Sequence, residues 1–283
     1  MVGAAYGCQM SNPVLVGTDG SVISDAAVRW AAAEAGRRGA ALHVVHAWVW
    51  PLMKVSLGPG PGMPAGTGFQ AQADRTLAEA VSAALATVAG LAVRTTLLVG
   101  DPAARLVAAA RDAQLLVVGN RGLGGFTGLM LGSVSSSVVA HAACSIVVVR
   151  GDLRSHGPVV VGVDEAGASR TAVDAAFGAA DRAGVGVVAV HAYRSPGPGS
   201  AQETAARDAL EEELAVARGK YPDVPVTTRF GTHSPARELV EASEGAQLIV
   251  VGARGSGGFA PFMIGSTSIA LIRHAHCPVL VQR

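Results

Sequence analysis

The sequence predicts an α/β fold built from two copies of one unit, each with five parallel strands covered by helices on both faces. Residues 117–150 recur as residues 250–283, with glycines, a phenylalanine, a histidine and a cysteine at the same spacing. Short apolar runs alternate with segments of helical length, and these runs show little alternation of apolar and polar residues. Such continuous apolar strands are typical of parallel sheets that are buried on both faces. We therefore interpret the chain as a tandem duplication.

The length and the composition fit two globular domains. The chain has 283 residues, which is the length of about two domains of roughly 100–200 residues each. We expect one domain over residues 1–150 and a second over residues 151–283, with a linker at 151–157. Half of the residues are apolar, so each half can bury a core. The net charge is +1 and no basic stripe occurs, which argues against nucleic acid as a partner.

The cysteines and the N-terminal sequence favour a cytoplasmic protein. Cys8, Cys144 and Cys277 are an odd number without metal-ligand spacing, and they are expected to be small buried residues in a reducing compartment. The N-terminus lacks a basic segment followed by an apolar one. No run of about 18 uncharged apolar residues occurs. We expect a soluble cytoplasmic protein without a membrane partner.

The elements of the first half follow from local patterns in chain order. Apolar runs predict strands at 13–18, 41–48, 93–99, 115–118 and 145–149. Periodic alanine-rich segments predict helices at 26–35, closed by Gly36 and Gly39, at 71–89, from Pro102 to about residue 111, and from Ser133 onward. Residues 51–68 are rich in proline and glycine, which excludes a regular element there.

The second half repeats this order after the linker. A strand at 159–163 leads to Asp164, which matches Asp19, and strands at 187–193 and 226–230 match the second and third strands. The offset between the copies is 145 residues up to His191 and 133 from Pro235 onward. The second copy therefore lacks twelve residues where the first has the segment 51–68. We also expect a two-residue change near Gly231.

A glycine-rich loop after the fourth strand of each half points to an anion. In each copy the strand ends at a glycine, a loop with several glycines and one arginine follows, and a Gly-Ser pair opens a helix. Glycine lets the backbone adopt positive φ and approach a ligand closely. Main-chain N–H groups beside the positive end of a helix bind anions, and we expect phosphate. Ligands of open parallel sheets lie at the carboxyl ends of the strands, so Asp19, Ala47, Gly100 and Gly119 should meet at one edge.

The loop pattern and the duplication together carry a family resemblance. The pattern G-x2-G-x9-G-[ST] is complete twice, at Gly119, Gly122, Gly132 and Ser133 and at Gly252, Gly255, Gly265 and Ser266. With an aspartate after each first strand, the sequence from residue 13 to residue 283 resembles tandem universal stress proteins of the ATP-binding branch. The resemblance implies a Rossmann-like, adenine nucleotide alpha hydrolase-like sandwich in each half. It also implies a regulator of stress response or growth that binds one ATP, with Mg2+, in each domain.

The resemblance further implies a role for individual residues. Asp19 and Asp164 would hold the adenine or ribose side, Ala47 and Ala192 would contact adenine through the main chain, and the loops would hold the phosphates. No catalytic residue and no metal-ligating side chain is implied. The nucleotide-binding residues expected in the first half are Gly17, Asp19, Ala47, Gly100, Val118, Gly119, Asn120, Arg121, Gly122, Gly124, Gly125, Gly132, Ser133, Val134 and Ser135. Those expected in the second half are Gly162, Asp164, Ala192, Gly231, Val251, Gly252, Ala253, Arg254, Gly255, Gly257, Gly258, Gly265, Ser266, Thr267 and Ser268.

The resemblance also implies how the chain associates. Family members commonly form dimers through the last strand of the domain. In a tandem chain the two halves would first pair with each other, and we expect a homodimer of such chains. An unidentified regulatory protein is the further partner that this function implies.

Several of these residues also have a purely structural interpretation, and both interpretations stay open. Asp19 and Asp164 could cap the helices that follow them, and Arg121 and Arg254 could be solvated instead of pairing with phosphate. The hydroxyl side chains at the helix starts could bind phosphate, cap the helix, or do both. Those hydroxyl residues are Ser133, Ser135, Ser266, Thr267 and Ser268.

The histidines are better explained by packing than by chemistry. His46 and His191 lie in core strands and fit buried histidines better than catalytic bases. Other histidines lie near two cysteines and suggest a metal only superficially, because their positions inside an apolar helix or before a strand favour packing. Those residues are His141, His274, His276, Cys144 and Cys277.

Three other functions compete with that of a nucleotide-binding regulator. Residues 255–260 match the G-x-G-x-x-A pattern of dinucleotide folds, but Thr127 breaks it in the first copy and no carboxylate follows either loop, which argues against NAD. A slow ATPase or nucleotide-transferring enzyme using the same pocket stays open, although no lysine lies near either loop. An interaction scaffold with empty sites also stays open, and the two complete loops argue against it.

Overall fold

A computed structural model describes residues 12–48, 68–123, 131–164, 169–192, 201–253 and 264–283. All of its helices and strands lie within these ranges. The elements of the first half appear in the predicted order. They are β1 (Val14–Thr18), α1 (Val22–Arg38), β2 (Leu42–Trp48), α2 (Phe69–Thr87), β3 (Val93–Val99), α3 (Pro102–Ala109), the short 3-10 helix η1 (Ala110–Asp112), β4 (Leu115–Gly119), α4 (Ser133–His141) and β5 (Ser145–Val149).

The second half repeats this series, apart from the 3-10 helix. Its elements are β6 (Val159–Val163), α5 (Arg170–Ala183), β7 (Val187–Ala192), α6 (Ala201–Lys220), β8 (Val226–Gly231), α7 (Pro235–Ala242), β9 (Leu248–Gly252), α8 (Ser266–His274) and β10 (Val279–Gln282). The α/β class and the repeated five-stranded parallel unit are thus confirmed.

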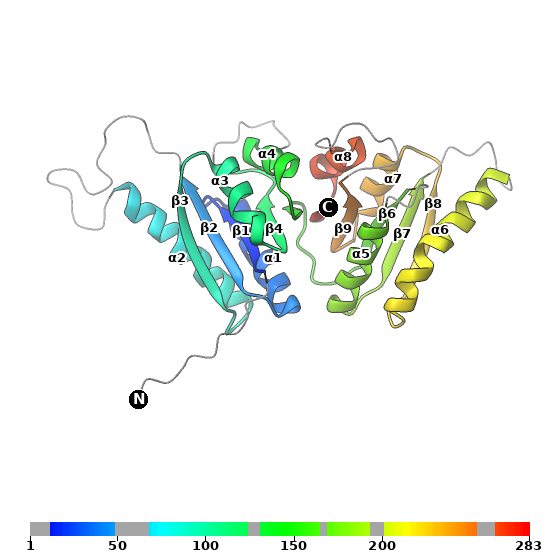
Figure 1. The fold of residues 1–283 in the computed structure, drawn as a ribbon, viewed down its shortest axis with the longest axis horizontal. Helices are drawn as coiled ribbons and strands as arrows, with labels where there is room; N and C mark the ends of the chain where they lie inside the picture. Colours follow the sequence, from blue (N-terminus) through cyan, green and yellow to red (C-terminus); the bar gives the residue numbers. More distant parts are fainter. Residues whose placement is uncertain (1–11, 49–67, 124–130, 165–168, 193–200, 254–263) are drawn as a thin grey trace.

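The two halves form one continuous sheet. Its ten strands run in the order β3-β2-β1-β4-β5-β10-β9-β6-β7-β8. The order is symmetric, because each strand and its equivalent in the other half lie equally far from the central β5–β10 pair. Strands pair in parallel within each half, whereas β5 and β10 pair antiparallel where the halves meet, with Val147 opposite Leu280. The expected pairing of the two halves within the chain is therefore confirmed (Figure 1).

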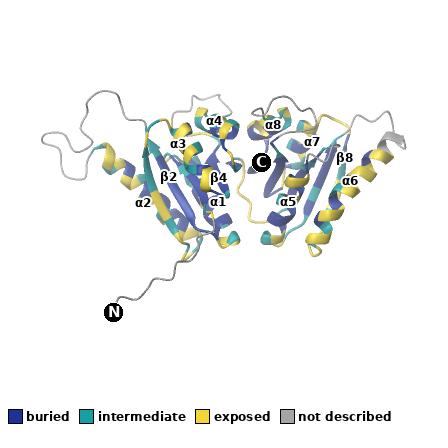
Figure 2. Cartoon of the chain, in the orientation of Figure 1, coloured by how far each residue is buried: buried dark blue, intermediate teal, exposed yellow. Residues whose placement is uncertain are grey.

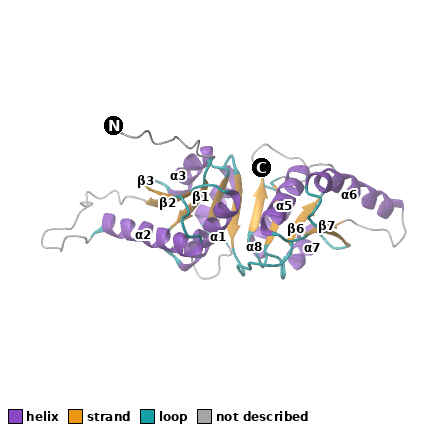
Figure 3. Cartoon of the chain, turned by 90° about the horizontal axis from the view of Figure 1, so that it is seen from below, coloured by secondary structure: helices purple, strands orange, loops and turns teal. Residues whose placement is uncertain are grey.

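Helices cover both faces of the sheet and complete two apolar layers. One layer contains residues of α1, α2, α5 and α6, and the other contains residues of α3, α4, α7 and α8. Each layer holds residues from both halves, so the core continues across the β5–β10 pair. Figure 2 shows the buried strands between helices that are exposed on their outer sides, and Figure 3 shows the helices on both faces. In the part of the chain that is described, no helix is both long and apolar enough to span a membrane.

Two details of the predicted elements are wrong. Gly36 lies inside α1, and only Gly39 ends the helix, where it adopts the left-handed conformation with φ of 61°. The two-residue change expected near Gly231 does not occur. Leu97 lies opposite His46 and Phe230 lies opposite His191, so the offset of 133 residues already holds in the third strand of each half.

Candidate functional site

The glycine-rich loop of the first half is held against the end of β1 by Asp19. One carboxylate oxygen of Asp19, Oδ1, accepts a hydrogen bond of 3.0 Å from the main-chain N–H of Ser21. The other, Oδ2, accepts one of 2.7 Å from the N–H of Leu123 in the loop. Asp19 is not the helix cap, because the N-cap of α1 is Ser21, whose hydroxyl accepts from the N–H of Ser24. The structure therefore brings the predicted aspartate and the predicted loop together.

Asp19 is ionised at neutral pH. Its partial burial acts to raise the pKa of the carboxyl, but hydrogen bonds from Ser21, Leu123 and Ser24 outweigh burial and hold the pKa below its usual value. A carboxylate that accepts several N–H bonds is stabilised in its charged form. The first half thus places a negative charge where β1 ends, beside the start of the glycine-rich loop.

Two loop glycines are required by close approaches. A Cβ atom at Gly122 would overlap Oδ2 of Asp19, and one at Gly119 would lie 2.8 Å from Cγ2 of Ile23. Any side chain at either position would therefore displace the loop or its neighbour. These glycines allow the loop to lie directly on β1 and the start of α1.

The same main-chain frame holds the loop in both halves. In the first half the N–H of Asn120 donates to the carbonyl of Val149, and the N–H of Gly132 donates to the carbonyl of Asn120. In the second half Ala253 donates to Gln282 and Gly265 donates to Ala253, at 2.8 and 3.0 Å. The loop is thus closed at its base twice, by bonds between equivalent residues.

The serines at the helix starts divide into two kinds. Ser135 and Ser268 are buried and donate to the carbonyls of Gly119 and Gly252, at 2.6 and 3.0 Å. Each therefore fastens its helix to the strand before the loop, a role that the sequence did not indicate. Ser133 and Ser266 are exposed, and Val134 and Thr267 are half-buried, at the first turns of α4 and α8. The first main-chain N–H groups of a helix have no partner within the helix and can bind an anion.

The predicted adenine end lies where β1 and β2, or β6 and β7, finish side by side. Nδ1 of His46 bonds with the carbonyl of Thr18 at 2.8 Å, and Nδ1 of His191 bonds with that of Val163 at 3.0 Å. Both histidines are buried, as expected for core residues. Ala47 and Ala192 follow them directly and are half-buried at the sheet edge.

The two halves differ at the end of the third strand. In the first half Gly100 has φ of 128°, and a Cβ atom there would lie 2.7 Å from Nε of Arg105. The register places His233 and Glu238 at the equivalent positions in the second half. A guanidinium in one half is therefore replaced by a carboxylate in the other.

Glu238 is the buried centre of a polar cluster that was not predicted from the sequence, and its partners His233 and Arg229 are exposed. Its side chain is 5% exposed and accepts bonds from Nδ1 of His233 at 2.8 Å, from the N–H of His233 at 3.1 Å and from Nη2 of Arg229 at 3.3 Å. The carboxyl group packs on Gly231, which leaves no room for a Cβ atom there. Because a two-residue change is expected near Gly231, the sequence does not point to this cluster. A constant offset of 133 residues between the two copies pairs Arg105 with Glu238.

The remaining predicted residues are placed as follows. Gly17 and Gly162 make room for helices, because a Cβ atom would lie 3.0 Å from Leu106 or 2.9 Å from Leu239. Val118 and Val251 are buried in β4 and β9, Arg121 is exposed, and Asp164 donates its N–H to Oγ of Ser169 at 2.7 Å. The predicted residues that lie outside the described part of the chain are Gly124, Gly125, Arg254, Gly255, Gly257 and Gly258.

Metal and thiol chemistry find no support among the described residues. In the ranges given above, no group of three His, Cys, Asp or Glu residues is arranged to hold a metal ion. Burial raises the pKa of Cys277 to about 12 and also raises that of Cys144. The thiol of Cys277 is thus protonated and unreactive at neutral pH.

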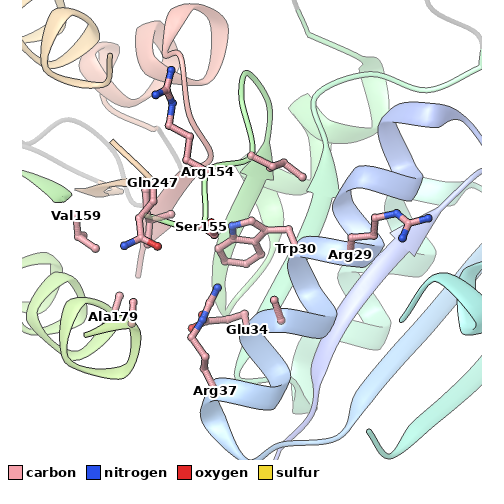
Figure 4. A pocket seen from close by; sticks show the side chains of 13 residues that line it. Arg29, Trp30, Glu34, Arg37, Arg154, Ser155, Val159, Ala179 and Gln247 are labelled. Atoms are coloured by element: carbon pink, nitrogen blue, oxygen red, sulfur yellow. The ribbon is translucent and has the colours of Figure 1, made fainter. Parts of the chain in front are cut away.

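A separate pocket of about 200 Å³ lies between the halves, near the starts of β6 and β9 and away from both loops (Figure 4). Glu34 of α1 forms part of its wall and accepts bonds from Arg38 at 2.6 Å, Arg37 at 3.0 Å and Arg182 of α5 at 3.4 Å. Glu34 therefore joins α1 to α5, and the pocket is the crevice that remains between these helices and the linker.

Comparison with known proteins places this fold in one family. The family model described as the universal stress protein family matches residues 10–150 and again residues 156–283. A universal stress protein of Mycolicibacterium smegmatis is 38% identical over 285 residues, and one of Mycobacterium tuberculosis is 37% identical over 289; each match covers 95% of this chain and 96% of the relative. A universal stress protein structure from Archaeoglobus fulgidus has the same fold, with a TM-score of 0.73 at 22% identity over 96% of this chain and 98% of that one. The chain belongs to the universal stress protein family and carries two copies of the family's domain.

Proposed function

We propose that each half binds one adenine nucleotide, ATP with Mg2+, at the carboxyl edge of its strands, and that the protein is a nucleotide-responsive regulator of stress response or growth. The observation that carries this proposal is the contact between Asp19 and the N–H of Leu123, which joins the carboxylate after β1 to the glycine-rich loop. The loop frame that occurs in both halves supports a second site.

The chain's own groups account for the parts of such a site. The first main-chain N–H groups of α4 and α8 would hold the phosphates, since the positive end of a helix attracts anions. Asp19 and Asp164 would accept hydrogen bonds from ribose hydroxyls, and the main chain at Ala47 and Ala192 would recognise adenine. Mg2+ prefers oxygen ligands and is usually bound in part by the phosphate oxygens of the substrate, so it would enter with the nucleotide.

The proposal extends to the organisation of the chain. Residues 1–150 and 151–283 would be the two nucleotide-binding domains, in a cytoplasmic protein. Nucleotide would change the surface shown at the loop edge, and a regulatory partner protein would read this surface. Two such chains would form a homodimer.

Titration of the full chain with MgATP tests the proposal. We expect two sites in the wild-type chain, one site after Asp19→Ala or Asp164→Ala, and none after both changes. Asp174→Ala is the matched control, because Asp174 is an exposed carboxylate that pairs with Lys220 on the outer surface. A double variant that binds MgATP as tightly as the wild type would overturn the proposal. Chromatography of the nucleotide after incubation would separate binding from slow hydrolysis.

A further inference from the structure

Two equivalent arginines reach from one half of the molecule into the other. Arg150 follows β5, and its Nη1 donates to the carbonyl of Leu271 at 3.3 Å and to that of Ala275 at the end of α8. Arg283 follows β10, and its Nη2 donates to the carbonyls of Val139 at 2.6 Å and Ala140 at 3.2 Å near the end of α4. The two contacts are reciprocal because the arginines occupy the same position in the repeat.

These contacts place a guanidinium at the ends of two particular helices, and the carbonyl of Leu271 also accepts the N–H of Ala275. The last carbonyl groups of a helix have no partner within the helix and carry partial negative charge, so a guanidinium there stabilises the helix end. The helices are α4 and α8, whose other ends begin beside the glycine-rich loops. Each helix is thus fastened by its own half at its start, through Ser135 or Ser268, and by the opposite half at its end.

Each arginine is also the direct neighbour of a residue that holds a loop. Val149, which accepts from the loop residue Asn120, precedes Arg150. Gln282, which accepts from the loop residue Ala253, precedes Arg283. The last residue of β5 or β10 therefore contacts the loop of its own half, and the arginine that follows it contacts α8 or α4 of the other half.

We propose that Arg150 and Arg283 are positioning residues that act across the halves. Arg150 positions α8 for the nucleotide site of the second half, and Arg283 positions α4 for that of the first half. This inference rests on the proposed function for its effect on binding, but the positioning itself is a property of the helices. The two sites are then linked through these side chains, although Asp19 and Asp164 belong to separate halves.

Hydrogen exchange tests the positioning without any nucleotide. Arg283→Ala should speed exchange about 3- to 10-fold at the last amides of α4, such as that of Ala142, and leave α8 unchanged. Arg150→Ala should do the reverse, at amides such as that of Ala275. Arg154→Ala is the matched control, because Arg154 is an exposed arginine of the linker that pairs with Asp152. Faster exchange in the arginine's own half alone, or equally in both helices, would overturn the inference.

Titration with MgATP tests the consequence for the sites. In the Asp164→Ala background, which keeps the first site, Arg283→Ala should raise Kd about 3- to 10-fold and Arg150→Ala should leave it unchanged. In the Asp19→Ala background the two arginine variants should exchange their effects. Arg150→Lys and Arg283→Lys, which keep a cation at the helix end, should restore part of the affinity, whereas a general loss of folding would not follow this crossed pattern.

Failure of the proposed nucleotide binding and failure of the inference about the two arginines give different results. A wild-type chain that binds no MgATP would refute the proposed function, while the exchange measurement would still decide whether the arginines hold the opposite helices. A chain that binds MgATP without the crossed pattern would refute the inference alone.

Discussion

Glu238 is a buried carboxylate whose surroundings fix its charge. Burial acts to raise the pKa of Glu238, but the hydrogen bonds from His233 and the positive charge of Arg229 outweigh it and hold the pKa below its usual value. A pKa that is lower in the folded state means that the carboxylate stabilises the fold above the pKa of the unfolded chain. This contribution is lost as the pH falls through the folded-state pKa.

The variant Glu238→Gln should therefore be less stable than the wild type at neutral pH, by about 1–3 kcal/mol, because a charged acceptor of three hydrogen bonds is lost. The difference should begin to shrink as the pH falls below the unfolded-state pKa of about 4.3, and it should vanish as the pH falls through the lower folded-state pKa, where the wild-type carboxyl also takes up a proton. Urea unfolding over a series of pH values measures it. Glu241→Gln is the control, since Glu241 is 44% exposed and pairs with Arg229 and Arg237 at the surface. A loss of equal size at every pH would contradict the assignment.

Gly122 is the residue at which the loop and the carboxylate meet. In Gly122→Ala the new Cβ would overlap Oδ2 of Asp19, so the bond between Asp19 and Leu123 should break. We expect the affinity of the first site for MgATP to fall about tenfold or more, which is the effect of about one to two lost hydrogen bonds. Gly219→Ala is the matched control, because a Cβ there meets open space. Unchanged affinity in Gly122→Ala would show that this contact does not shape the site.

At the scale of elements, a single hydroxyl fastens α4 to β4 and another fastens α8 to β9. Ser135→Ala would leave the buried carbonyl of Gly119 without this donor, at a cost of about 1–3 kcal/mol. Ser268→Ala should have a similar effect through Gly252. Thermal unfolding measures both losses. The neighbouring variant Ser136→Ala removes an exposed hydroxyl that bonds within its own helix, so it should lie within about 0.5 kcal/mol of the wild type. Equal effects of Ser135→Ala and Ser136→Ala would contradict this role.

The strands and helices could be predicted because their signals are local. Buried strands such as β4 are continuous apolar runs, and Gly39 ends α1 because glycine adopts positive φ easily. The fact that Asp19 and the loop lie together also followed from the rule that strand ends share one edge.

The polar contacts of the site could not be predicted in the same way. They depend on strand register and on side-chain directions that only the packed structure sets. The register of β8 is the main example. It places His233 and Glu238 at the sheet edge, with Gly231 directly under the carboxyl group of Glu238. The reciprocal arginine contacts likewise depend on how the halves meet, which the repeat alone does not specify.

At the scale of the whole molecule, the two halves share a sheet and both core layers. Val147 of β5 and Leu280 of β10 are buried and lie opposite each other at the antiparallel pair, within one apolar layer. Apolar contacts that cross the boundary make the folding of each half depend on the other. Two-state unfolding is common for single domains and fails for independent ones, so the shared core predicts one transition for the entire chain.

Tryptophan fluorescence can test this prediction, because all three tryptophans, Trp30, Trp48 and Trp50, lie in the first half of the sequence. In urea, the fluorescence transition should coincide with the circular dichroism transition, which reports on helices of both halves. Leu280→Ala, a change in the second half, should lower the free energy of unfolding by about 2–5 kcal/mol and shift both transitions together. Val216→Ala, at a 78% exposed position of α6, should shift neither. If Leu280→Ala left the tryptophan transition in place while the dichroism transition split, the halves would unfold independently, and the shared core would contribute little to their coupling.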